Sequence, residues 1–382
     1  MRFPIFRLLL SPVALMLASC GSAATGESAA SVAVPTEQAP FTLIEAARFE
    51  EPWAIAFLPD GSALVTEKAG TLKLWSAGSP ARDVAGVPKV DHGGQGGLGD
   101  VILAPDFATS GMVYLSWAEA GSGDNRGAAV GRARLVTRDA PRLEDLQVIW
   151  RQDPKVTGRG HYSHRLRFSP DGQHLFVASG DRQKMTPAQD MSGNLGKIVR
   201  LLPDGTPAPG NPFAQQGGIA AQAWSLGHRN VLGLEFDAQG RLWDLEHGPG
   251  GGDELNLVRP GANYGWPLVS QGNHYDGRAI PRHATRPDLA APAISWNPVI
   301  APGGFLFVRG NALPGWQGNA LIAAMSPAGL VRVAIDGATA REVARYPMDN
   351  RIRAVAQAPD GTIWLLEDGG NARLLKLVPR QR

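Results

Sequence analysis

The chain has only one cysteine among its 382 residues, so no intramolecular disulfide can form. Excess charge of one sign is also lacking. The formal net charge is +2, and Lys and Arg form no run beyond scattered pairs, which argues against a nucleic-acid-binding protein. With 43% hydrophobic and 19% charged residues, the composition is that of a folded globular protein. Residues that favour turns are abundant: the chain has 47 glycines and 30 prolines, which indicates many tight turns.

The one long apolar run lies at the amino end. Arg2 and Arg7 form a short basic region, Leu8 to Leu17 are apolar, and small residues follow. This order predicts an export signal over residues 1–19, which is too short and wrongly flanked for a membrane-spanning helix. We therefore expect an exported protein.

The single cysteine stands at the end of this signal. The segment LASCG resembles a bacterial lipobox, in which the cysteine, here Cys20, is acylated and becomes the mature amino terminus. The alternative is an ordinary signal peptide with an incidental cysteine. Residues 20–40 are rich in small and polar residues without an apolar period, which predicts a flexible tether. We expect a protein held by a lipid on the periplasmic side of a membrane.

From residue 41 onward one pattern repeats: an alternating apolar strand, a tight turn and a second strand. Asp-Gly between such runs is a strong hairpin signal, because glycine supplies the positive φ that the turn needs. Four strong copies turn at Pro59 to Gly61, Pro170 to Gly172, Asp237 to Gly240 and Pro359 to Gly361, and two weaker copies start at Val101 and Gly303. Six hairpins without a convincing helix predict an all-β fold, a single six-bladed β-propeller with long inter-strand loops over residues 41–382. Two stacked sandwiches would need a mid-chain linker, and none is evident.

One loop, EHGPGGGDELN (Glu246–Asn256), combines glycines with acids. A phosphate-binding loop needs backbone N–H groups at a helix start, usually followed by Lys. Here Asp253 and Glu254 follow instead and would repel phosphate, whereas carboxylate and carbonyl oxygens suit calcium. In isolation, a glycine-rich turn with solvated acids remains an equal alternative.

The segments around this loop carry a family resemblance. WSLGHRN precedes it and NYGWP follows it. Further blocks occur in family order, including GGQGGLGDVILAPDF, GRGHYSHRL, WNPVIAPGG and NRIRAV. Together they resemble the soluble quinoprotein sugar dehydrogenases, in particular the bacterial aldose sugar dehydrogenases, over nearly the whole chain from Phe49. That family implies a six-bladed propeller that binds pyrroloquinoline quinone (PQQ) and calcium.

The resemblance implies a role for each matching residue. His161 matches the general base that takes the proton of the sugar's anomeric hydroxyl, while His164 gives local support. Arg229 matches a catalytic residue that, with Asn230, stabilises charge on the quinone oxygens. The implied cofactor contacts are Gln95, His161, Arg229, Asn230, Tyr275, Trp296, Arg351 and Arg353. Trp296 and the arginine pair have ordinary structural alternatives, as core packing and as solvated charges.

The resemblance also implies two calcium sites. The carbonyls of Gly248 and Pro249 match ligands of the ion that touches PQQ, and Glu254 with the carbonyl of Tyr264 matches a second, structural site. Two positions depart from the family: Met325 and its neighbours replace a lysine, and Val299 replaces Ser or Thr. Each departure removes a polar contact to the cofactor, worth about 1–3 kcal/mol.

The sequence therefore predicts a PQQ- and calcium-dependent enzyme that oxidises aldose sugars at C1 to lactones. Electrons would pass to an external acceptor, and the lipid anchor would be the only membrane contact. Two alternatives remain open at this point: a calcium-dependent propeller hydrolase of the lactonase type, and a propeller that binds partners without catalysis.

Overall fold

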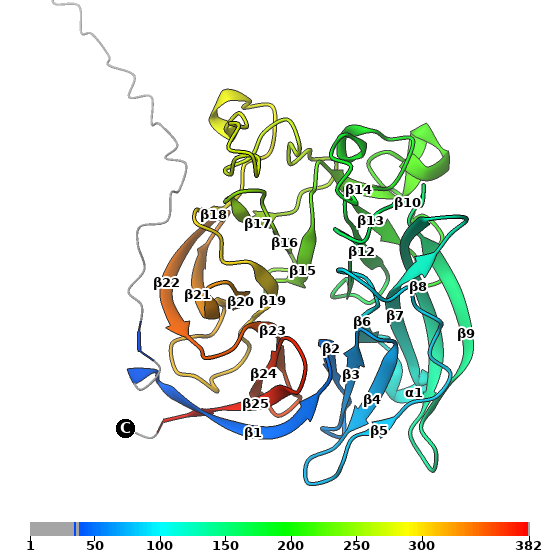
Figure 1. Ribbon diagram of the computed structural model, residues 1–382, viewed down its shortest axis with the longest axis vertical. Helices are drawn as coiled ribbons and strands as arrows, with labels where there is room; N and C mark the ends of the chain where they lie inside the picture. Colours follow the sequence, from blue (N-terminus) through cyan, green and yellow to red (C-terminus); the bar gives the residue numbers. More distant parts are fainter. Residues whose placement is uncertain (1–33, 36–37, 381–382) are drawn as a thin grey trace, which may run out of the picture.

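The computed structural model describes residues 34, 35 and 38–380, and the predicted signal segment and Cys20 lie outside this part. The described chain folds into six antiparallel sheets arranged in a ring around a central opening (Figure 1). This confirms the predicted six-bladed propeller. Among the described residues, no helix is long and apolar enough to cross a bilayer.

The blades follow one another along the chain. The first contains β2 (Pro52–Phe57), β3 (Ala63–Glu67), β4 (Thr71–Trp75) and β5 (Arg82–Asp83). The second contains β6 (Leu98–Leu103), β7 (Met112–Ala120), β8 (Asn125–Val136), β9 (Arg142–Arg151) and β10 (Val156–Thr157). The third contains β11 (Ser163–Phe168), β12 (Leu175–Ser179), β13 (Lys197–Leu201) and β14 (Ala223–Leu226).

The second half of the ring has the same plan. The fourth blade contains β15 (Val231–Phe236), β16 (Leu242–Glu246), β17 (Asp253–Leu257) and β18 (Ile294–Trp296). The fifth contains β19 (Pro302–Phe307), β20 (Ala320–Met325), β21 (Ala328–Asp336) and β22 (Thr339–Pro347). The sixth contains β23 (Ile352–Gln357), β24 (Ile363–Glu367), β25 (Ala372–Pro379) and β1 (Phe41–Phe49). Short helices are α1 (Phe107–Ser110), η2 (Thr186–Gln189), η3 (Ala214–Gln216), η4 (Gly218–Gln222) and η5 (His283–Thr285).

The ring is closed by the two ends of the described chain. Strand β1 pairs antiparallel with β25, with Phe41 opposite Pro379 and Phe49 opposite Ala372, so the first strand completes the last blade. Packing begins even earlier, because Ala39 is buried and the N–H of Val34 donates to Arg345 O at 2.8 Å. The end of the predicted tether is thus docked on the propeller.

All six predicted hairpins are the first two strands of a blade. In the first blade Gly61 has φ +85°, and Asp60 Oδ1 accepts the N–H of Ser62 at 2.9 Å. Each of the six gaps between neighbouring blades holds one apolar cluster, as expected when both faces of every sheet are buried. Turn chemistry therefore makes the hairpins, and burial between blades joins them into a ring.

The inner strands share one irregularity that matters for function. Strands β2, β6, β11, β15, β19 and β23 line the channel, and each has a register shift against its partner near its first residues. A β-bulge bends a strand and re-aims the side chains next to it. The residues just ahead of the inner strands therefore collect at one mouth of the channel.

Candidate functional site

His161 lies at this mouth, two residues before β11. Its backbone has φ +49°, and Ser163 and His164 also have positive φ, at +58° and +49°. Such angles are costly for non-glycine residues and cluster at functional sites. The N–H of His161 donates to Gln95 Oε1 at 2.6 Å, so the structure brings these two predicted residues together.

Asp181 fixes the imidazole of His161. His161 Nδ1 donates to Asp181 Oδ1 at 2.7 Å, while Asp181 Oδ2 accepts the indole N–H of Trp266, also at 2.7 Å. With Nδ1 carrying the proton, Nε2 keeps its lone pair. Burial lowers the pKa of His161 below 6.5, and the charge of Arg229 lowers it further although Asp181 opposes the shift. The neutral imidazole is therefore the form present at neutral pH.

His164 has a different environment. Its Nδ1 lies 2.8 Å from Ser116 Oγ, its ring stacks on Trp53 at 4.9 Å, and burial lowers its pKa to about 3. This histidine supports the blade junction, as predicted from its position.

Arg229 reaches the same mouth from the fourth blade. Its NH2 group donates to Tyr275 Oη at 3.0 Å, and its NH1 group donates to the carbonyl of His247 at 3.1 Å. Its Nε is buried without a hydrogen-bond partner among the described residues. The next residue, Asn230, accepts from Ser163 Oγ at 3.3 Å. Arg229 thus holds an unused donor beside His161, which suits an anionic or carbonyl oxygen.

Arg351 and Arg353 approach from the sixth blade and share one carboxylate. Asp368 Oδ2 accepts Arg351 Nε at 2.8 Å, and Asp368 Oδ1 accepts Arg353 Nε at 2.8 Å and NH2 at 2.6 Å. The pair therefore lies on one side of the strand, as its spacing predicts. At the position where the family has a lysine, Met325 Sδ lies 3.4 Å from Arg351 NH2.

The four predicted metal residues also come together. Gly248, Pro249, Glu254 and Tyr264 line one small cavity of about 10 Å³. Burial and the charge of Glu246 raise the pKa of Glu254 well above its usual value, and no described Lys or Arg forms an ion pair with Glu254. Asp253 Oδ1 accepts the N–H of Gly248 at 2.9 Å and so shapes the loop. A buried carboxylate beside carbonyl oxygens fits a calcium ion, and Arg229 lines the same cavity.

One sequence prediction does not fit this constellation. Trp296 lies at the end of β18, the outermost strand of its blade, where it is only 2% exposed. Its indole N–H donates to Glu342 Oε2 at 2.7 Å, and its ring packs in the core between the fourth and fifth blades. The tryptophan is core packing, because an outer strand cannot present a side chain to the channel mouth.

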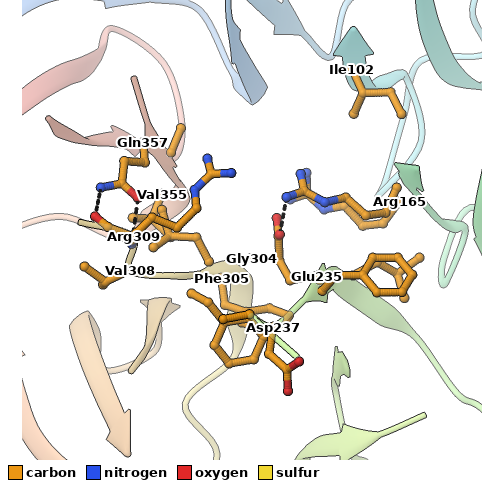
Figure 2. Close-up of a pocket in the computed structure, with 18 of the residues that line it drawn as sticks. Ile102, Arg165, Glu235, Asp237, Gly304, Phe305, Val308, Arg309, Val355 and Gln357 are labelled. Carbon is orange, nitrogen blue, oxygen red and sulfur yellow. Dashed lines mark hydrogen bonds and ion pairs between the residues drawn. The ribbon is translucent and has the colours of Figure 1, made fainter. Parts of the chain in front are cut away.

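A larger cavity of about 1000 Å³ occupies the other part of the channel. Figure 2 shows Arg165, Glu235 and Arg309 around it. Burial raises the pKa of Glu235 to about 7, and Arg167 forms an ion pair with it. The lining residues come from the far ends of the inner strands, whereas His161, Asn230 and Arg351 precede those strands. The candidate site is therefore at the mouth with the converging base, arginines and metal residues.

Sequence reasoning missed several residues here, chiefly Asp181, His247 and Asp368. His247 Nε2 donates to Pro302 O at 2.7 Å, and burial lowers its pKa to about 3, so this imidazole is neutral. His247 and Asp368 directly follow the second strand of a blade, and Asp181 comes two residues after such a strand. Comparing the residues after these second strands would have drawn attention to all three.

Known proteins resemble this chain in sequence and in fold. Residues 49–376 match the family model described as Glucose / Sorbosone dehydrogenase. Aldose sugar dehydrogenase YliI of Escherichia coli is 38% identical over 342 residues, which cover 87% of this chain and 91% of that protein.

Two solved structures extend the comparison. The apo-form soluble aldose sugar dehydrogenase from Escherichia coli superposes with a TM-score of 0.84 at 37% identity and covers 89% of this chain and 100% of its own. The PQQ-bound aldose sugar dehydrogenase from Streptomyces coelicolor has a TM-score of 0.71 at 27% identity and covers 88% of this chain and 98% of its own. With a family match over most of its length and a close structural likeness, the chain belongs to the glucose/sorbosone dehydrogenase family, as its sequence motifs predict.

Proposed function

We propose that this protein is a PQQ- and calcium-dependent dehydrogenase that oxidises aldose sugars at C1 to lactones. The observation that carries the proposal is the His161–Asp181 pair beside Arg229, whose Nε is a buried donor without a partner. A base and an unused cationic donor at one channel mouth are what oxidation of an alcohol by hydride removal requires. The family's PQQ-bound relative supports the choice of cofactor.

The residues at the mouth fit PQQ. Its three carboxylates call for guanidinium partners, and Arg351 and Arg353 present two on one side, oriented by Asp368. Arg229 and Asn230 would donate hydrogen bonds to the quinone oxygens, and Gln95 and Tyr275 would contact the cofactor as well. When bound, PQQ supplies the o-quinone that accepts the hydride. Trp296 is left out, because it belongs to the core.

His161 would take the proton of the C1 hydroxyl at Nε2. Asp181 holds the opposite nitrogen, so the lone pair needs no rearrangement before the proton moves. Once the proton is taken, the carboxylate stabilises the imidazolium. The low dielectric around these buried groups strengthens that stabilisation.

Calcium would occupy the cavity that the glycine-rich loop lines. The carbonyls of Gly248 and Pro249 are assigned to an ion at the cofactor, and Glu254 with the carbonyl of Tyr264 to a structural ion. The glycines are required by close approach: Gly252 has φ +73°, and a Cβ there would collide with the backbone of Gly272. The loop can therefore bend tightly enough to turn carbonyls inward.

Location and electron transfer complete the proposal. The predicted export signal and lipobox place the propeller on the periplasmic side, held by a lipid on Cys20. Electrons then pass to an external acceptor there.

Reconstitution tests the function directly. Purified apo-protein should bind PQQ in the presence of calcium, with a change in quinone absorbance, and should then reduce a dye when glucose or other aldoses are added. No quinone binding together with lactone hydrolysis would favour the hydrolase alternative. No binding and no turnover with any aldose or lactone would favour a non-catalytic propeller.

Asp181→Asn provides a pH-resolved prediction. The hydrogen bond from His161 to Asp181 raises the pKa of the base against the lowering effect of burial, so its loss should lower that pKa further. We expect kcat to fall about 10²-fold, within the range for impaired general-base catalysis. Activity of the wild type should be lost as pH falls through the lowered pKa, and this acid limb should move to lower pH in the variant.

The pH profile of kcat/KM checks this, with quinone affinity measured separately. An unchanged acid limb would contradict the role of Asp181. A fall in quinone affinity with normal kcat would show that the residue only supports the fold of the cofactor site.

Glu254→Gln tests the structural calcium. A ligand that binds only the folded state stabilises it by about 2.7 kcal/mol at a hundred-fold excess over Kd. Calcium should therefore raise the melting temperature of the wild type, and the variant should lose most of that increase. Without calcium the variant should be at least as stable as the wild type, because a buried, unpaired carboxylate has been neutralised. Equal calcium responses of the two proteins would exclude Glu254 as a ligand.

A further inference from the structure

A second group of metal-ligating side chains adjoins the residues assigned to calcium, and one member, Glu246, also lines the calcium cavity. It consists of His228, Asp244 and Glu246, which are at most 4% exposed. One ligand atom of each lies within 4.8 Å of the other two. His228 Nδ1 is 3.4 Å from Asp244 Oδ2 and 3.1 Å from Glu246 Oε1. Two carboxylate oxygens therefore face one imidazole nitrogen, which can offer only one proton.

The remaining polar atoms of the three side chains are held by neighbours. His228 Nε2 lies 2.8 Å from Ser225 Oγ, and Glu246 Oε2 accepts the N–H of Arg229 at 2.7 Å. Asn256 Nδ2 donates to Asp244 Oδ1 at 3.1 Å. Such outer contacts orient the ligands in metal centres.

Two atoms of this cluster are unsatisfied. Asp244 Oδ2 and Asn256 Oδ1 are buried without a hydrogen-bond partner, and both residues are 0% exposed. Within residues 38–380 no Lys or Arg side chain forms an ion pair with Asp244 or Glu246. Buried carboxylates without a balancing charge are strongly unfavourable, so either a proton or a cation must neutralise this pair.

From this geometry we propose that His228, Asp244 and Glu246 bind one structural zinc ion. Asn256 Nδ2 donates to Glu246 Oε1 at 3.3 Å, so this amide must turn over before its oxygen can serve as a fourth ligand. Zinc binds imidazole nitrogen and carboxylate oxygen tetrahedrally at about 2.0–2.2 Å, which places ligand atoms roughly 3.3–3.5 Å apart. The separations from His228 Nδ1, 3.1 and 3.4 Å, match that spacing with little movement. Calcium requires six to eight oxygen ligands, which this group does not provide.

The proposed ion lies between two segments that carry residues of the candidate site. His228 immediately precedes Arg229, and Glu246 is the first residue of the glycine-rich loop, directly before His247. An ion shared by His228 and Glu246 ties the segment that presents Arg229 to the segment that presents Gly248. It is a structural ion, since its ligands leave no position open to solvent.

Elemental analysis of the purified full chain tests the proposal. Protein from zinc-supplemented cells should carry one zinc per chain after dialysis, whether or not PQQ and calcium are present. X-ray absorption at the zinc edge should show nitrogen and oxygen ligands without sulfur. Cobalt exchanged into the site should give the visible bands of four-coordinate cobalt. Less than about one tenth of a zinc per chain, before and after incubation with zinc, would overturn the assignment.

Matched variants locate the ion. D244N should lower zinc affinity at least about 100-fold, the upper range for disturbed metal centres. H174N removes a histidine on the opposite turn of the third blade and should keep the zinc. E254Q should lose its calcium response and keep the zinc. If D244N does not fold, the X-ray absorption spectrum of the wild type still tests the proposal. A spectrum without nitrogen ligands, or a His228 Nδ1 that carries a proton in nitrogen NMR, would overturn the proposal.

Discussion

His161→Gln is expected to reduce kcat by about 10²–10⁴-fold with saturating quinone and sugar. The glutamine amide cannot take a proton at neutral pH, whereas burial and the charge of Arg229 keep the imidazole of His161 neutral and ready to accept one. The effect should appear in kcat, because the proton moves only in the reacting complex. Single-turnover reduction of the bound quinone by glucose is the measurement.

His174→Gln is the matched control for this change. His174 lies in the turn between β11 and β12, at the other end of the same blade, with its N–H bonded to Ser169 Oγ at 3.0 Å. That variant should keep wild-type turnover. Full single-turnover rates in His161→Gln would show that another group is the base.

Arg165→Met is expected to lower the free energy of unfolding by about 3–5 kcal/mol, the range for breaking a buried ion pair. Arg165 lies on β11 in the channel (Figure 2), where NH1 donates to Asp100 Oδ1 at 3.3 Å. Its Nε donates to Leu232 O at 2.7 Å, and its NH2 donates to Gly303 O at 2.6 Å. The guanidinium also stacks on Trp53, 3.8 Å from the ring centroid. One side chain therefore connects five blades across the channel.

Denaturant unfolding of two further variants shows how much of this loss comes from the buried ion pair with Asp100. Arg165→Met with Asp100→Asn should recover part of the loss, because the second change removes the stranded carboxylate. Arg167→Met should cost much less, since that side chain is about one third exposed and its ion pair with Glu235 is screened by solvent in the cavity. Equal losses for Arg165→Met and Arg167→Met would contradict the bridging role.

Local chemistry in the sequence determined the fold class. Asp-Gly turns between alternating strands predicted six hairpins, and each became the inner half of a blade, because turn type and strand period depend on neighbouring residues alone. Family motifs also named residues that the fold brings together, such as Arg351 with Arg353 and the four residues of the metal cavity. A motif fixes how far apart residues are along the chain. The inner strands, with their bulges, then place those residues at the mouth of the channel.

Only the tertiary structure decided which residues meet from different blades. Asp181 and Trp266 are 85 residues apart, and no local pattern links them. The closure of the ring by β1 joins residues more than 300 positions apart. Trp296 is buried in the core although it belongs to a family motif. Its place on the outermost strand of the blade, which depends on strand order within the sheet, puts it between two blades. Turns and strand periods are set by local backbone and side-chain chemistry, whereas convergence at a channel requires the closed ring, a property of the whole chain.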